Sequence, residues 1–156
     1  MGRTLALDHG ERRLGLAISD PTGVIALPLD VRRREGWNAD LAYLRGVIEQ
    51  HAVDEIIVGR PLTTRGEVGV QAREAARFAA RLREALGVPV REVDERFSTA
   101  AADRAMREGG DRPRRRREHR DAVAAALILQ PVLDRRARGA GAGPLRDPNE
   151  GVMLAP

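Results

Sequence analysis

Carboxylates occupy three points of the sequence at which they could build a reactive site. Asp8 ends an apolar segment near the N-terminus, the pair Asp94-Glu95 ends another, and Asp121 opens a long apolar stretch. In an open α/β sheet, side chains just beyond the carboxyl ends of neighbouring strands converge on one crevice. Carboxylates gathered there repel one another unless cations lie between them, and oxygen ligands select Mg²⁺ or Mn²⁺. Two such ions, about 3.5–4 Å apart, activate a water molecule and stabilise the leaving oxygen in phosphodiester cleavage.

Each of these acids also has a purely structural interpretation. Asp8 could simply end a strand, and Asp94 and Glu95 could cap the following helix or face solvent. Asp121 could be the N-cap of a buried helix. Only the combination of the three positions favours a shared metal site.

The composition excludes several other kinds of chemistry. The chain has 156 residues with a formal net charge of +4, its 27 basic residues are all arginine, and it has no cysteine. Without lysine there is no P-loop, Schiff-base enzyme or protein kinase, and without cysteine there is no disulfide, thiol nucleophile or cysteine-bound metal. No apolar run reaches the length of a membrane span, and a charge at Asp8 interrupts any secretory core, so we expect a cytoplasmic protein without membrane contact. The length predicts one compact domain.

The hydrophobic pattern predicts the elements that must position the acids. Period-two or continuous apolar segments predict strands at 4–7, 14–19, 24–31, 54–59 and 88–93, and helical spacing predicts helices at 38–51, 69–86, 98–108 and 121–136. This order predicts an α/β fold, namely a five-stranded mixed sheet with a three-strand antiparallel meander, two parallel strands and helices on both faces. We expect Gly10 and Gly15 to frame the first turn. The domain should span residues 1–137, and the Gly/Ala/Pro-rich tail at 138–156 should be disordered.

Arginines near the predicted site are candidates for binding nucleic-acid phosphates. Arg12 and Arg13 lie in the first turn, and Arg60 follows the fourth strand, where it would project into the crevice beside the acids. An arginine-rich run at 112–120 directly precedes Asp121. Its candidate phosphate-binding members are Arg114, Arg115, Arg116, Arg117 and Arg120. A charge run can also be a solvated surface, but its place next to the acids favours an arm that grips phosphates.

Four blocks of the sequence resemble the signature of the YqgF/RuvX family. They are LDHGERRLGLAISD at 7–20, IVGRPL at 57–62, DERFST at 94–99 and DAVAAALILQ at 121–130. The blocks occur in family order, and the resemblance covers about residues 3–135. It implies an RNase H-like fold and a divalent-metal nuclease, with members linked to maturation of the 5′ end of pre-16S ribosomal RNA and to resolution of Holliday junctions.

The resemblance also assigns roles to the acids. The family's catalytic, metal-binding acids fall on Asp8, Glu95 and Asp121, with Asp94 in reserve for the second position and Mg²⁺ or Mn²⁺, as two ions, for the cofactor. Other branches of the fold place an acid after the fourth strand, where this chain has Gly59-Arg60.

The substrate remains open between branched DNA and precursor ribosomal RNA. The sequence has few aromatic residues on which single-stranded bases could stack, which favours recognition of backbone and shape in structured nucleic acid. The alternative to an endonuclease is a non-catalytic nucleic-acid-binding or ribosome-assembly factor that keeps the fold. Symmetric cutting of a junction would favour a two-fold homodimer.

Overall fold

The computed structural model describes residues 2–60, 69–94 and 113–139. The elements of these residues follow one another in chain order as β1 (Arg3–His9), β2 (Arg13–Ser19), β3 (Ala26–Arg33), α1 (Trp37–His51), β4 (Val53–Arg60), α2 (Val70–Ala85), β5 (Val90–Asp94) and α4 (Pro113–Arg138). The short helix predicted at 98–108 and nearly all of the predicted tail lie outside the described residues. Within the described ranges, no helix combines the length and the apolar character needed to cross a membrane.

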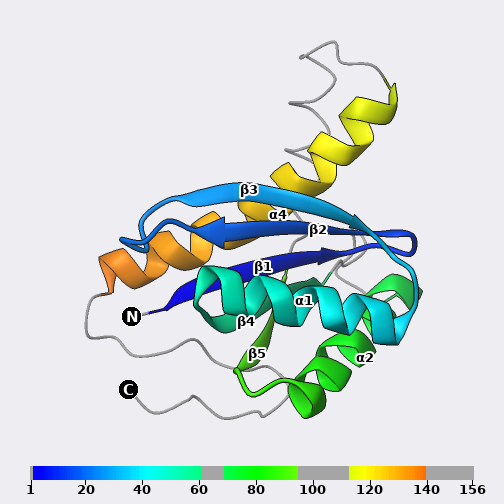
Figure 1. Ribbon diagram of the computed structural model, residues 1–156. Coiled ribbons are helices and arrows are strands. Elements are labelled where there is room, and N and C mark those ends of the chain that lie inside the picture. The colour runs from blue at the N-terminus through cyan, green and yellow to red at the C-terminus, as the bar shows by residue number, and fades with distance from the viewer. Residues whose placement is uncertain (1, 61–68, 95–112, 140–156) are drawn as a thin grey trace.

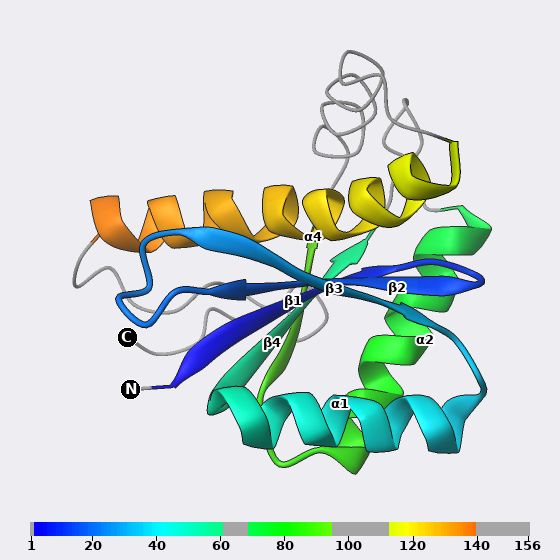
Figure 2. The same cartoon turned by 45° about the horizontal axis from the view of Figure 1, so that its top comes forward.

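The strands form one mixed sheet in the order β3-β2-β1-β4-β5. β1 pairs antiparallel with β2, and β2 with β3, whereas β1 pairs parallel with β4, and β4 with β5. The predicted meander and the two parallel strands are therefore confirmed. Helices α1 and α2 cover one face of the sheet and α4 crosses the other, as Figures 1 and 2 show. Because β1 is central, its carboxyl end is flanked by strands on both sides.

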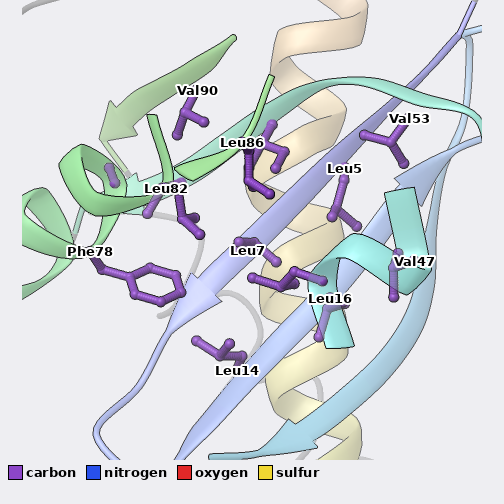
Figure 3. Close-up of a cluster of buried hydrophobic side chains, with 14 of the residues drawn as sticks. Leu5, Leu7, Leu14, Leu16, Val47, Val53, Phe78, Leu82, Leu86 and Val90 are labelled. Atoms are coloured by element: carbon purple, nitrogen blue, oxygen red, sulfur yellow. The ribbon is translucent and has the colours of Figure 1, made fainter. Parts of the chain in front are cut away.

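The two faces of the sheet are packed with side chains of different size. On the face of α1 and α2, leucines from β1 and β2 join Phe78 and Leu82 of α2 in the larger apolar cluster (Figure 3). On the face of α4, the strands contribute the small Ala6 and Ala17 together with Ile57. Small residues allow the axis of α4 to lie close to the sheet, and this brings functional groups of helix and strands together.

Helix α4 begins earlier than the sequence pattern predicted. The prediction placed its start at Asp121, but the helix starts at Pro113 and includes most of the arginine run. Proline is well suited to the first helical position, and arginine is a good helix former, so this polar segment needs no apolar face to be helical. The expected arm is therefore the first two turns of α4 rather than a separate loop.

Candidate active site

Asp8 stands at the carboxyl end of the central strand, on the face covered by α4. Side chains alternate along a strand, so Asp8 shares a face with the buried Ala6. Its neighbours in register are Gly15 on β2 and Gly59 on β4. Because both neighbours lack a side chain, neither places a side chain beside the half-buried carboxylate of Asp8.

Asp121 reaches the same place because α4 packs directly on Gly15. A Cβ atom added to Gly15 would overlap the main-chain carbonyl of Asp121, so only glycine permits this approach. Gly15 lies inside β2, and the expectation that it frames the turn is wrong. The turn is closed instead by the amide of Gly10, which donates to the carbonyl oxygen of Arg13 at 2.9 Å. Gly15 pairs with Asp8 on β1 and contacts Asp121 on α4, so it brings the two predicted acids into the same region.

The carboxylates of Asp8 and Asp121 line one open pocket of about 210 Å³. The other residues of its wall come from the β1–β2 turn, and they are Gly10, Glu11, Arg12 and Arg13. The two carboxylates supply the hard oxygen donors that Mg²⁺ and Mn²⁺ require. Among the residues that the structure describes, no group of three acids or histidines is close enough to hold a metal. The pocket thus offers two of the three predicted ligands of a divalent ion, and the third, Glu95, lies outside the described residues.

An ion pair ties Asp121 to the β1–β2 turn. The Nε atom of Arg13 donates to Oδ2 of Asp121 at 2.6 Å, and the two side chains are 30% and 19% exposed. Arg13 shares the α4-facing side of β2 with Gly15, two residues further on. The short distance is typical of a charge-assisted hydrogen bond.

The opposite side of the turn is held by Arg34. Its Nη1 atom donates to the carbonyl oxygen of Gly10 and lies 3.0 Å from Nε2 of His9, and its main-chain amide donates to the carbonyl oxygen of Arg12. Burial and the charge of Arg34 lower the pKa of His9 to about 4. His9 is thus neutral at pH 7 and can accept the hydrogen bond from Arg34. The buried Asp40 lies 3.6 Å from Nε of Arg34 and compensates its charge.

Two of the predicted site residues begin on the other face of the sheet. Arg60 continues the alternation of Ile56 and Val58, which pack toward α1 and α2. Asp94 is its neighbour in register on β5 and shares a side with Val90, which packs toward the same helices. Neither residue lines the pocket. The structure therefore separates Arg60 and Asp94 from the two acids.

The remaining predicted arginines differ in their positions. Arg12 is exposed at the pocket wall beside Arg13. Arg120 is half-buried on α4 and does not line the pocket. Arg114, Arg115, Arg116 and Arg117 belong to the first turns of α4, the end of this helix that extends past the sheet in Figure 1.

Comparison with known proteins places the chain in a family. A family model described as RuvX, Holliday junction resolvase, matches residues 2–135. The chain belongs to the RuvX family. The resemblance seen in the four sequence blocks is thereby confirmed. A relative in Koribacter versatilis (strain Ellin345), named "Putative pre-16S rRNA nuclease", is 45% identical over 135 residues, which make up 86% of this chain and 88% of that protein. A relative of the same name in Roseiflexus sp. (strain RS-1) is 42% identical over 133 residues, or 85% of this chain and 94% of that protein.

A solved structure gives the fold of this RuvX chain independently. RuvC of Thermus thermophilus, in complex with a Holliday junction substrate, matches with a TM-score of 0.52 over 88% of this chain and 97% of that one. Its sequence is 20% identical, so the match concerns the fold alone. The RNase H-like fold is confirmed. The family and the names of the relatives assign the chain to the nucleases.

Some residues of the site were missed by sequence reasoning. Glu11 lines the pocket as a third acid of the wall, and its signal was its place three residues after Asp8. Arg34 and Asp40 support the β1–β2 turn from a distant part of the sequence. No local sequence pattern predicts a contact between residues so far apart in the chain. Gly15 was noticed, but its contact with α4 requires the packed structure.

Proposed function

We propose that this RuvX-family chain is a divalent-metal-dependent endonuclease that hydrolyses phosphodiesters in structured nucleic acid. The observation that carries the proposal is the convergence of Asp8 and Asp121 on one open pocket, from positions 113 residues apart in the sequence. Two acidic residues that line one pocket, with arginines at the same wall, suit a site for cations and phosphates. The two candidate substrates are the 5′ region of pre-16S ribosomal RNA and the four-way DNA junction.

Asp8, Glu95 and Asp121 would hold Mg²⁺ or Mn²⁺, as two ions. When bound, the ions supply an activated water molecule and charge stabilisation for the leaving oxygen. Asp94 lies on the face opposite to Asp121, which favours Glu95 over Asp94 as the third acid. The half-buried Asp8 lines the open pocket, where ions and a substrate phosphate would bind.

Arginines at the wall of the pocket would hold the phosphodiester backbone. Arg12 is exposed there, and its planar guanidinium matches a phosphate group with two hydrogen bonds. The arginines in the first turns of α4 extend the positive charge beyond the sheet. Arg60 starts on the opposite face, and a role for it at the pocket would require its side chain to reach around the end of β4.

The aromatic residues favour recognition of backbone and shape. Trp37, Tyr43 and Phe78 all pack with the core on the α1 and α2 face, away from the pocket. Base stacking by these three residues is therefore excluded at the site, and stacking is the usual means of reading single strands. A duplex or branched region, in RNA or DNA, is the favoured substrate.

Cleavage assays test the proposal directly. We expect the protein to cut a pre-16S leader RNA or a four-way DNA junction in Mn²⁺ or Mg²⁺ and not in EDTA. Asp8→Asn should reduce the cleavage rate about a thousandfold, or about 4 kcal/mol, because it removes a metal-binding charge. Asp134→Asn removes one carboxylate at an exposed position on α4 that does not line the pocket, so it is the matched control and should cleave normally.

The alternative, a non-catalytic binding or assembly factor, predicts a different result in the same assay. Such a protein would bind these nucleic acids without metal-dependent cleavage, and Asp8→Asn would bind equally well. Cleavage by Asp8→Asn at the wild-type rate would also contradict the proposed mechanism. If the junction is cut symmetrically, we expect a two-fold homodimer, and sedimentation of the complex should show two protein chains per junction.

A further inference from the structure

The ion pair between Arg13 and Asp121 uses only part of each side chain. Asp121 receives a hydrogen bond on Oδ2, and no described residue engages Oδ1. Arg13 gives only its Nε atom to this contact. Within the described residues, the carboxylate is therefore held through Oδ2 alone.

The backbone around this pair leaves it little freedom. Asp121 is pressed onto Gly15 through its main-chain carbonyl, and Arg13 lies on the same face of the same strand. The carbonyl oxygen of Arg13 also closes the turn with Gly10 at 2.9 Å. Both partners thus start from rigid elements, and their ion pair fixes the orientation of the Asp121 carboxylate beside Asp8.

We propose that Arg13 is a positioning residue, which orients the Asp121 carboxylate so that Oδ1 faces a divalent cation in the pocket. This role rests on the proposed metal-dependent function, and it differs from direct contact with nucleic acid. Carboxylates that bind metals are commonly held by a second hydrogen-bonded group, whose loss weakens metal binding by about 10–100-fold.

The sign of the effect separates positioning from simple electrostatics. If Arg13 were only a neighbouring positive charge or a competitor for Asp121, then its removal would tighten binding of a divalent cation. If Arg13 positions Asp121, then its removal weakens binding although the site becomes more negative. Arg12 lines the same pocket from the same turn, and in the part of the chain that the structure describes it forms no ion pair with an acid. Arg12→Gln is therefore the matched control for the loss of one charge.

Calorimetric titration of Mn²⁺ into the full chain, without nucleic acid, tests the inference. We expect Arg13→Gln to bind Mn²⁺ at least about tenfold more weakly than wild type, and Arg12→Gln to bind equally or more tightly. In Asp121→Asn, the further change Arg13→Gln should have little effect, because the positioned group is gone. Arg13→Lys keeps a donor and the charge, so it should recover part of the affinity and serves as the second variant if Arg13→Gln does not fold.

Three results would overturn the positioning role. They are equal or tighter Mn²⁺ binding by Arg13→Gln, the same weakening by Arg12→Gln, and a wild-type protein that binds no Mn²⁺. Metal-dependent cleavage by wild type together with either of the first two results would remove this role and leave the proposed nuclease intact.

Discussion

Charged groups removed from water hold the turn that carries the site. Asp40 is 1% exposed and lies within 3.6 Å of both Arg32 and Arg34. Arg34 in turn contacts His9 and the main chain of the turn. Loss of one member would leave another charge buried without compensation, which is strongly destabilising. The geometry at Asp8 thus depends on residues that never contact a substrate.

His9 should make the stability of the fold depend on pH below neutrality. Its pKa falls from 6.5 to about 4 on folding, first because of burial and then because of Arg34. The unfolded chain therefore binds this proton at a higher pH than the folded protein. The free energy of unfolding has its full value above about pH 6.5 and decreases as the pH falls toward 4. Since His9 is only half-buried, we expect a loss of about 1–2 kcal/mol.

Urea unfolding between pH 7 and pH 4 measures this loss. His9→Gln can still accept a hydrogen bond from Arg34 but does not titrate, so its stability should fall less steeply over the same range. Parallel pH profiles for the two proteins would show that His9 is not the source.

At the scale of elements, helix α4 is fixed to the sheet at two places along its length. Near the pocket the contacts are the Arg13–Asp121 ion pair and the packing on Gly15. At the far end, Arg136 donates two hydrogen bonds to the Glu55 carboxylate at 2.7 and 2.9 Å. These attachments keep Asp121 in place relative to β1.

Gly15→Ala should separate helix from sheet. The new methyl group would overlap the Asp121 carbonyl, so α4 must shift, and overpacking of this kind costs about 1–3 kcal/mol. We expect a lower melting temperature and a loss of metal-dependent cleavage. Gly46→Ala is the control, because Gly46 lies in α1 with nothing within 4 Å of an added Cβ atom. That change should raise stability by about 0.5–1 kcal/mol, and equal effects of the two changes would contradict the packing argument.

The strands and helices were easier to predict than the face of the sheet to which each residue at a strand end points. The alternation in β1 and β2 and the apolar run in β4 reflect burial, so the strands and their order followed from the sequence. The start of α4 did not, because the helix there is polar and lacks an apolar stripe. Asp94 and Glu95 could not be told apart by position at a strand end, since one residue decides which face a side chain takes. The register of β5 with β4 supplies that information for Asp94.

At the scale of the whole molecule, positive charge is carried beyond the pocket by the first turns of α4. Each phosphate contact contributes about −0.9 to the slope of log binding constant against log salt on duplex DNA. Replacement of Arg114, Arg115, Arg116 and Arg117 by glutamine, if each contacts one phosphate, should therefore flatten this slope by about 3.6. The control removes four exposed arginines from α2 and the far end of α4, namely Arg73, Arg77, Arg135 and Arg138. Fluorescence anisotropy across a salt series measures the slope for both variants. Equal flattening in the two would show that the arginines in the first turns of α4 contribute no more to binding than other exposed arginines.

The central claim is that Asp8 and Asp121, with Glu95, form one divalent-metal site. Anomalous diffraction at the manganese edge from crystals soaked in Mn²⁺ tests it most directly, because the ions are located without reference to activity. The account predicts manganese peaks in the pocket, within about 2.0–2.4 Å of oxygens of Asp8 and Asp121, and their loss in Asp8→Asn. Manganese found only elsewhere on the molecule, at a concentration that supports cleavage, would contradict it.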